Sequence, residues 1–485
     1  MAGNEKWITP TMKQMFVVLG ISLNMSGMGA ILGFPAVLLP QLRAPGSQIT
    51  VDSVSGSWIA SIVGLSLLAG NLMVPTLMGK FGRKIASLIS CTNILVCWIW
   101  LVLATDVTSI LIARALQGLS LGINLSLSPI MVGEFTSPSN RGMFSSIMAS
   151  SITAMTLLVH VAGSYLAWQT ASLICAAISF TSLAVLLFSP ESPSWLADKG
   201  RFEDSRQSYR WLRGDAENEE LEKMLEARTV RDENTHRNNI FSYIKKAFSR
   251  REFNKPVLIM IHLYMLSLWS GMALLVVYTV DTIHAIVGND VDVALHITIL
   301  DVQRTISTIF GLIIIKKLKR RTVLSVTVGL NFATLVSIAA YTYIKANTSL
   351  PFDHPAIGLT LLHIHMCSMS TGALPMPIII SGELFPLEFR SLAGGISAIA
   401  FSVNYFLTSK TVMLLYNSIG IYGTYALYAA VTFYCLVVIL IFLPETKDRT
   451  LQDIEEEFRG TPRVKSAEDN AAAIPLNASH KDDEV

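Results

Sequence analysis

Eight charged residues recur as two copies along the chain, and their types suit ion pairing rather than covalent chemistry. The first copy comprises Arg83, Glu134, Arg141 and Glu191, and the second comprises Arg320, Glu383, Arg390 and Glu445. In each copy the Glu nearer the N-terminus is followed seven positions later by an Arg. Because the guanidinium fork matches carboxylate geometry, we expect these side chains to form bidentate pairs.

Apolar segments must position these charges. A helix needs about 20 apolar residues to cross a bilayer, and the sequence predicts twelve such spans. They cover 14–40, 55–79, 85–105, 108–133, 143–165, 168–189, 257–280, 294–315, 322–344, 355–382, 391–418 and 421–443. A tight hairpin is expected near Trp168, because the stretch from Gly142 to Pro190 has no charged residue.

The composition agrees with a membrane protein. Of the 485 residues, 52% are apolar and 15% are charged, with a formal net charge of +2. That balance gives no indication of a nucleic-acid partner. The chain has no nucleotide-binding loop, no His-Glu-x-x-His motif and no nucleophile elbow. We therefore expect neither an enzyme nor a nucleotide, cofactor or metal site, and the expected surroundings are a lipid bilayer.

Basic residues set the expected orientation, since short cytosolic loops are enriched in Lys and Arg. Arg83, Arg141, Arg320 and Arg390 all fall in loops on one side, which predicts cytosolic N- and C-termini. The Asn347-Thr348-Ser349 sequon then lies outside, where Asn347 is a candidate for glycosylation.

The predicted organisation is all-α, with twelve transmembrane helices in two six-helix pseudo-repeats. Five segments follow: a cytosolic N-terminus at 1–13, a six-helix bundle at 14–189, a charged linker with short helices at 190–256, a second six-helix bundle at 257–443 and a cytosolic tail at 444–485. The tail beyond Thr461 is polar, and we expect it to be disordered.

Motifs in this order resemble the sugar porters of the major facilitator superfamily, up to about Phe458. The matching stretches are 81–84 (Phe-Gly-Arg-Lys), 129–134 with 141–142, 190–196 (Pro-Glu-Ser-Pro-Ser-Trp-Leu), 209–214 and 444–451. Ser57-Trp58-Ile59 and Gly382-Glu383 look like the insect facilitative trehalose and sugar transporter branch. The resemblance implies the major facilitator fold and a plasma-membrane location.

It also implies a gating role for the repeated charges. Pairs among them can lock the two halves together on the cytosolic side. Such a lock favours the outward-open state, and breaking it opens the inward path. The alternative is ordinary charge at helix ends that sets topology.

The substrate path departs from the family pattern. A Gln-Gln-x-Ser-Gly-x-Asn run is usual in span seven, but residues 267–273 read Ser-Leu-Trp-Ser-Gly-Met-Ala. Amides pair well with sugar hydroxyls, so their loss means a different substrate or a relocated set of polar contacts. The candidates for that path are His160, Ser267, Trp269, Ser270, Asp301, Arg304 and Asn404.

Asp301 and Arg304 are the strongest of these candidates, because charged residues inside a span are costly and usually face a polar cavity. They lie three positions apart, on one face of a helix. The alternatives are a structural ion pair, or Asp301 near the outer interface. For His160, packing is favoured over ligand contact.

The residues of span one bear on whether transport is coupled to protons. Proton-coupled relatives carry an Asp there, whereas 16–40 contains no acidic residue. The first hypothesis is therefore a facilitative uniporter for a sugar (trehalose or hexose-like) or polyol, working by alternating access. The alternatives are a transporter of another organic solute or a proton symporter using Asp301 and Arg304, and a non-transporting sensor.

Overall fold

The structure is a computed structural model of the 485-residue chain. It describes residues 9–214, 219, 221–222, 224–225, 240–288, 291–348, 354–385, 389–447, 449 and 451–459. Residue 349 of the sequon, part of the predicted linker and the predicted disordered tail lie outside the described residues.

The N-terminal half contains six long helices with short connections. They are α1 (Pro10–Arg43), α2 (Ser53–Phe81), α3 (Arg83–Val102), α4 (Val107–Phe135), α5 (Pro138–Tyr165) and α6 (Trp168–Leu187). Asp52 and Asp106 cap the starts of α2 and α4 by accepting hydrogen bonds from backbone N–H groups three residues on. The expected hairpin near Trp168 is present, since α5 ends at Tyr165 and α6 begins at Trp168.

The C-terminal half repeats this plan with more interruptions. It contains α11 (Arg251–Trp269), the π-helical segment η2 (Ala273–Val277), α12 (Thr279–Ile286), α13 (Val293–Lys317), α14 (Arg320–Asn347), α15 (Pro355–Ser368), a second π-helical segment η3 (Met369–Ala373), α16 (Met376–Leu384) and α17 (Arg390–Phe442).

Two predicted spans are broken near their middles. Span seven runs from α11 into α12 through Gly271, whose φ of 115° is left-handed, a conformation that favours glycine. Span ten runs from α15 through η3 to α16, where Pro375 lacks the N–H of a continuous helix. The sequence-based boundaries treated both spans as continuous, and neither break was predicted.

The last long element consists of two helices. Gly420, with φ 72° and ψ 174°, interrupts α17. Both ends of α17 lie near the charged end of the bundle, because the Leu443 carbonyl accepts from Arg321 and the ring of Phe389 contacts Phe253. The chain therefore turns back at Gly420. Eleven described helices are long and apolar enough to cross a membrane, and dividing the last one confirms twelve spans.

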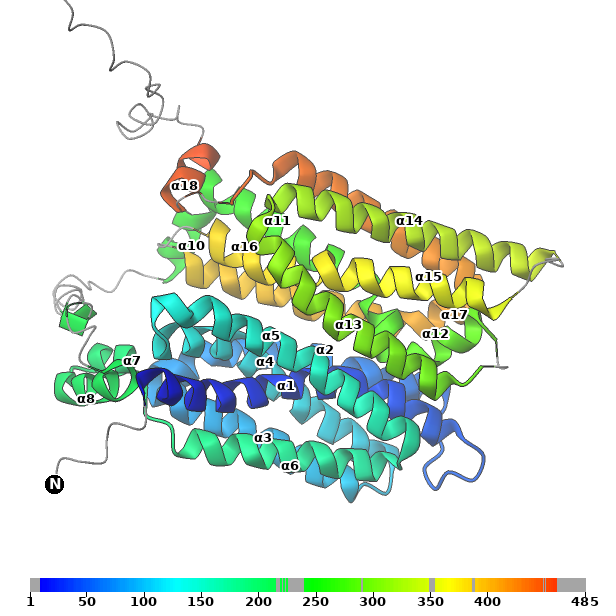
Figure 1. Cartoon of the computed structure of the whole chain (residues 1–485), viewed down its shortest axis with the longest axis horizontal. Coiled ribbons are helices and arrows are strands. Elements are labelled where there is room, and N and C mark those ends of the chain that lie inside the picture. Colours follow the sequence, from blue (N-terminus) through cyan, green and yellow to red (C-terminus); the bar gives the residue numbers. More distant parts are fainter. Residues whose placement is uncertain are drawn as a thin grey trace, which may run out of the picture.

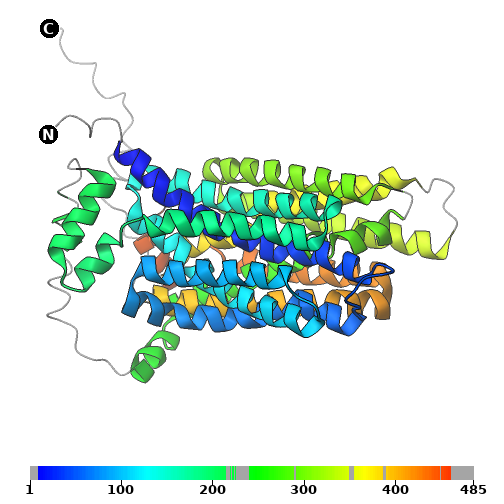
Figure 2. The same cartoon turned by 90° about the horizontal axis from the view of Figure 1, so that it is seen from below.

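The two halves lie side by side along their length (Figure 1). We call the end that holds Arg83 and Arg320 the basic end, and the opposite one the distal end. The short helices α7 (Pro193–Asp198), α8 (Phe202–Arg213), α10 (Ile240–Phe248) and α18 (Leu451–Arg459) gather at the basic end, as Figures 1 and 2 both show.

The short helices attach to different halves. In α8, Arg213 donates to the Thr136 carbonyl at 2.8 Å, and the Leu212 carbonyl accepts from Gln14 at 3.3 Å. In α18, Arg459 lies 3.3 Å from Glu252 at the start of α11. Each half thus has its own short helix bound to it at the basic end.

Candidate functional site

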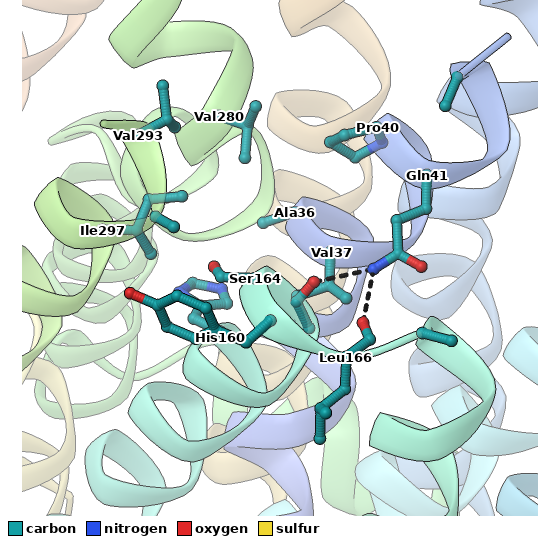
Figure 3. A pocket seen from close by; sticks show the side chains of 15 residues that line it. Ala36, Val37, Pro40, Gln41, His160, Ser164, Leu166, Val280, Val293 and Ile297 are labelled. Atoms are coloured by element: carbon teal, nitrogen blue, oxygen red, sulfur yellow. Dashed lines mark hydrogen bonds between the residues drawn. The ribbon is translucent and has the colours of Figure 1, made fainter. Parts of the chain in front are cut away.

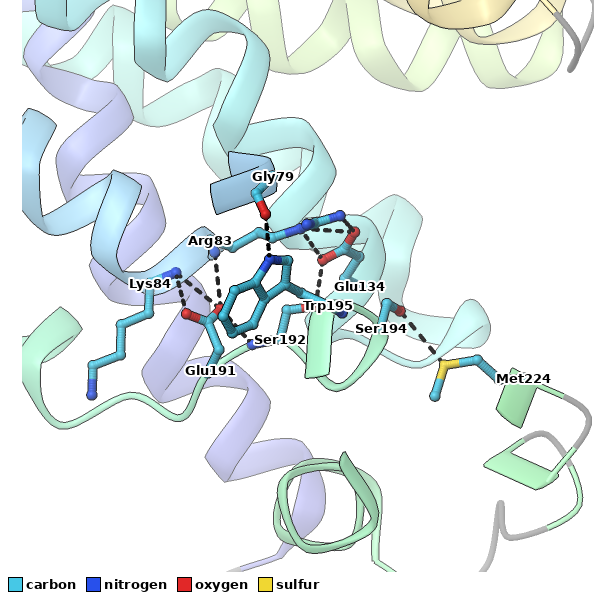
Figure 4. Close-up of polar contacts among 9 residues, drawn as sticks. All are labelled: Gly79, Arg83, Lys84, Glu134, Glu191, Ser192, Ser194, Trp195 and Met224. Atoms are coloured by element: carbon cyan, nitrogen blue, oxygen red, sulfur yellow. Dashed lines mark hydrogen bonds and ion pairs between the residues drawn. The ribbon is translucent and has the colours of Figure 1, made fainter. Parts of the chain in front are cut away.

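A carboxylate–guanidinium cluster lies at the basic end of the N-terminal half (Figure 4). Arg83, the first residue of α3, donates to Glu134 near the end of α4 through Nη2 at 2.8 Å and Nε at 2.9 Å. Glu191 accepts from the backbone N–H groups of Arg83 and Lys84 at 2.9 and 3.1 Å. Because Gly82 has no side chain to cap α3, Glu191 supplies that cap from another segment.

The same cluster recurs in the C-terminal half. Arg320 donates to Glu383 at 2.8 Å, and the backbone N–H of Arg320 donates to Glu445 at 2.9 Å. Thr446 donates to Glu383 at 2.5 Å, as Ser192 does to Glu134. The duplicated sequence pattern is therefore a duplicated three-dimensional unit.

These pairs lie within a half rather than between halves in this conformation, and the lock between the halves stays a prediction for the outward-open state. Arg83 and Glu134 both belong to the N-terminal half, and Arg320 and Glu383 both belong to the C-terminal half. The physical reason is proximity: in each half the Arg begins the helix that packs against the span whose basic end carries the Glu. The pairs stabilise the basic end of each half separately.

The other two repeated arginines lie outside these carboxylate pairs in the described residues. Arg141 donates to the Gly133 carbonyl at 2.8 Å. Arg390 is the exposed first residue of α17. Residues 386–388, which precede Arg390, lie outside the described residues.

Four polar contacts between described residues join the two halves, and three of them lie toward the distal end. Those three are Arg43–Asp281 at 3.0 Å, Lys410–Ser57 at 2.8 Å and His160–Asp301 at 2.5 Å. The fourth, Asn71 to Ser402 at 3.3 Å, lies beyond the middle toward the basic end. The halves are thus fastened mainly at the distal end.

The contact between His160 and Asp301 is the most deeply buried of the distal three. Their side chains are 1% and 2% exposed, against 26% and 24% for Arg43 and Asp281. Arg304 lies one turn from Asp301 and is 4% exposed, with its Nη1 3.9 Å from Asp301 Oδ1. The structure therefore brings together three of the residues predicted for the substrate path.

The hydrogen-bond partners of His160 indicate that His160 and Asp301 share one proton. His160 Nε2 lies 3.1 Å from the Gly33 carbonyl, which can only accept, so Nε2 carries a hydrogen. His160 Nδ1 then either donates to the Asp301 carboxylate or accepts from its protonated form. In both arrangements the pair carries one proton more than a neutral imidazole beside an ionised carboxylate would carry.

Gly33 makes this geometry possible. A Cβ added at Gly33 would lie 2.9 Å from His160 Nε2 and 2.9 Å from Thr156 Cγ2. The lack of a side chain lets α5 approach α1 closely enough for the imidazole to reach the Gly33 carbonyl.

A pocket of about 440 Å³ opens beside His160 at the distal end (Figure 3). Residues of both halves line it, including His160, Val280, Val293 and Ile297. Gln41 donates to the Gly163 and Leu166 carbonyls at 2.8 and 3.0 Å, so it ties α1 to the turn between α5 and α6.

Trp269 and Asn404, predicted separately, also meet. Trp269 Nε1 donates to Asn404 Oδ1 at 3.1 Å, and the Trp269 ring lies 5.0 Å from that of Tyr428. Ser267 is buried, and its carbonyl accepts from the Ser270 hydroxyl. Trp269 is only partly buried.

The break in span seven explains a histidine to which no role was assigned from sequence. The Ser270 carbonyl accepts from His365 at 2.7 Å and from Asn331 at 3.2 Å. These bonds replace the helical partner that the break at Gly271 removes. His365 and Asn331 therefore stabilise an interruption of the helix.

Arg114 is a functional candidate that the sequence reasoning missed. It is fully buried in α4 and donates to the Ile31 carbonyl at 2.8 Å, to Gln117 at 3.0 Å and to the Ile59 carbonyl at 3.3 Å. All three acceptors are neutral. An arginine inside the predicted span 108–133 was the available signal, because such residues are rare in a membrane helix.

Asn347 is exposed at the distal end of α14, where a sequon would be accessible. Among the described residues, no group of three or more His, Cys, Asp or Glu side chains could hold a metal ion.

Comparisons with known proteins agree with one family. Residues 14–458 match the family described as "Sugar (and other) transporter". The facilitated trehalose transporter Tret1 of Apis mellifera ligustica is 30% identical over 88% of this chain and 84% of its own length. Tret1 of Aedes aegypti is 27% identical over 96% of this chain, but the match spans only 57% of that protein.

Solved structures share the fold. The inward-open xylose transporter XylE of E. coli superimposes with a TM-score of 0.71 at 17% identity, covering 92% of this chain and 98% of that one. The proton:xylose symporter XylE bound to 6-bromo-6-deoxy-D-glucose gives 0.70 with the same coverage.

With the duplicated six-helix halves, the paired charge clusters and the match over residues 14–458, the chain belongs to the sugar transporter family, whose members are membrane transporters and not enzymes, and it has the major facilitator fold of the solved structures.

Proposed function

We propose that this protein is a facilitative uniporter for a sugar, trehalose or hexose-like, or for a polyol, and that it works by alternating access between its two halves. The observation that supports passive transport is the environment of α1. Residues 10–43 contain no acidic side chain, and the buried guanidinium beside this helix, Arg114, binds backbone carbonyls and an amide instead. Span one thus offers no carboxylate to carry a proton.

In this proposal the basic end is cytosolic, the distal end is extracellular and the protein resides in the plasma membrane. Both termini are then cytosolic, and Asn347 is a glycosylation site. The contacts near the distal end between the halves support a conformation closed to the outside. The repeated charge clusters act as gating elements by keeping the cytosolic end of each half rigid while the halves rotate.

The proposed solute path includes Trp269 and Asn404, with Ser267 and Ser270 at the break in span seven. Interrupted helices at membrane depth commonly mark solute sites in transporters. An indole face suits the apolar face of a sugar ring, and an amide suits its hydroxyls.

A second candidate, proton symport, is favoured by one observation. The buried pair of His160 and Asp301 holds a proton at the interface between the halves. A site that binds a proton in one conformation and releases it in another can couple solute movement to a proton gradient.

Uptake in oocytes distinguishes the two candidates. Labelled trehalose, glucose and a series of polyols are supplied at external pH 5.5 and 7.5, with water-injected oocytes as controls. Saturable uptake with the same rate at both pH values is expected for the uniporter. Uptake that rises on acidification and is lost in Asp301→Asn supports symport. Surface expression without uptake of any sugar or polyol rejects the sugar assignment.

A further inference from the structure

Asp301 lies between two basic side chains that belong to different halves. His160 comes from α5 in the N-terminal half and lies 2.5 Å from Asp301 Oδ2. Arg304 comes from the same helix as Asp301 and lies 3.9 Å from Oδ1, beyond hydrogen-bond distance. All three side chains are at most 4% exposed.

Arg304 is incompletely satisfied in this conformation. Its Nε and Nη1 atoms have no hydrogen-bond partner among the described residues, and neither does Asp301 Oδ1. Buried donors and acceptors without partners are expensive. Arg304 Nη1 and the unbonded Oδ1 of Asp301 nevertheless lie only 3.9 Å apart, so a small approach of the two side chains would bring them within hydrogen-bond distance.

The two halves must separate at the distal end for the path to open there. His160 would then move away with α5, while Asp301 and Arg304 stay together on α13. A buried carboxylate that loses its only hydrogen-bonding partner is strongly destabilised, so opening requires another group that can hydrogen-bond to Asp301.

We propose that Asp301 exchanges partners during transport: it binds His160 when the distal end is closed and Arg304 when that end is open. The exchange keeps the carboxylate paired in both conformations. It makes His160 the residue that stabilises closure and Arg304 the residue that stabilises opening. This inference rests on the proposed alternating access, but it does not depend on which solute is carried.

The other two distal contacts between the halves differ from the Asp301 cluster in exposure and in the type of partner. Arg43 and Asp281 are about one quarter exposed, and Lys410 binds the Ser57 hydroxyl and lies 3.9 Å from the centre of the Trp58 ring. Water replaces partners for exposed charges at little cost. The buried exchange at Asp301 is therefore the step that most affects the balance between the closed and open conformations.

Chemical labelling tests the exchange. Ala36 lines the distal pocket and is 4% exposed, so Ala36→Cys reports opening when cells are treated with a membrane-impermeant thiol reagent. Of the five cysteines, Cys367 is the one that is not fully buried, and Cys367→Ser is used as the background. The labelling rate is compared among otherwise identical His160→Gln, Arg304→Gln and Asp301→Asn variants.

The two cation variants are expected to shift labelling in opposite directions. His160→Gln weakens closure and raises the rate about tenfold, whereas Arg304→Gln removes the partner needed for opening and lowers it about tenfold. In the Asp301→Asn background both shifts disappear, because neither cation has a carboxylate to bind. Gln303→Leu, on the same helix but bonded to the His363 carbonyl within its own half, leaves the rate unchanged.

A purely structural cluster gives another pattern, in which both cation variants lower surface expression and change labelling in the same direction. That result, or equal rates in all variants, overturns the exchange. Failure of the proposed function is separate: labelling that shifts as expected in a protein that takes up no sugar keeps the exchange and rejects the substrate.

Discussion

The guanidinium of Arg114 donates to the Ile31 carbonyl, which is the carbonyl that Pro35 leaves without its helical partner. In a continuous helix the N–H of residue 35 would bond to the oxygen of residue 31, and proline has no N–H. Arg114 thus repairs the interruption of α1 from a neighbouring helix. It also binds the Ile59 carbonyl, so it links α1, α2 and α4.

This relationship predicts a coupled pair of substitutions. Arg114→Met leaves the Ile31 carbonyl unpaired and should destabilise the protein by about 1–3 kcal/mol. Pro35→Ala restores the helical N–H, so Arg114→Met should cost measurably less in that background. Thermal unfolding of the purified protein in detergent, for wild type, both single variants and the double variant, measures the coupling. Strictly additive effects would show that Arg114 does not serve the Ile31 carbonyl.

Gly33 should tolerate no larger residue, because its missing side chain leaves room for His160. Gly33→Ala places a carbon 2.9 Å from His160 Nε2 and Thr156 Cγ2, and such overpacking typically costs about 1–3 kcal/mol. Gly27→Ala is the matched control, since its nearest neighbour, Ile94, is 3.7 Å away. We expect a lower unfolding midpoint for Gly33→Ala only. Equal midpoints would mean that α1 and α5 are not closely packed at Gly33.

Stability should depend on pH through Glu191. Burial raises the pKa of Glu191 above its usual value of 4.5, since desolvation outweighs the hydrogen bonds from Ser192, Lys84 and Arg83. Between 4.5 and the raised pKa the folded protein holds a proton that the unfolded chain has lost. The free energy of unfolding should therefore fall as pH rises through that window and level off above it.

Glu191→Gln tests this dependence, because the amide keeps an oxygen that can cap α3 and cannot ionise. Unfolding midpoints measured from pH 4 to pH 8 should show a smaller decline in the variant than in the wild type. Identical pH profiles would assign the decline to other groups.

The sequence predicted the spans well because each one depends on local composition. Twelve apolar stretches and the duplicated charges were visible without knowledge of distant contacts. Other features depend on pairing between helices that are far apart in sequence. His160 and Asp301 are separated by 141 positions, and no spacing rule indicates that they meet.

The breaks in spans seven and ten were missed for a related reason. Hydropathy stays high through Gly271 and through Met369, so an apolar window does not detect the interruption. What stabilises the first break is a set of side chains on other helices, His365 and Asn331. The direction of the Arg83 and Arg320 pairs was also open from sequence, because either half offered a Glu at the same end.

The indole of Trp269 provides the most direct test of the proposed solute path. Trp269→Phe retains an aromatic face but removes the Nε1 donor that holds Asn404 at 3.1 Å. If the solute stacks on Trp269 and hydrogen-bonds to Asn404, the variant should raise KM about threefold to tenfold, since one neutral hydrogen bond is worth about 0.5–1.5 kcal/mol. Transport at saturating solute should change less. Trp100→Phe, which removes an indole bond to Ser109 within the N-terminal half, is the matched control and should leave KM unchanged. Concentration-dependent uptake of whichever sugar is carried measures both constants, and an unaltered KM in Trp269→Phe would remove Trp269 from the path.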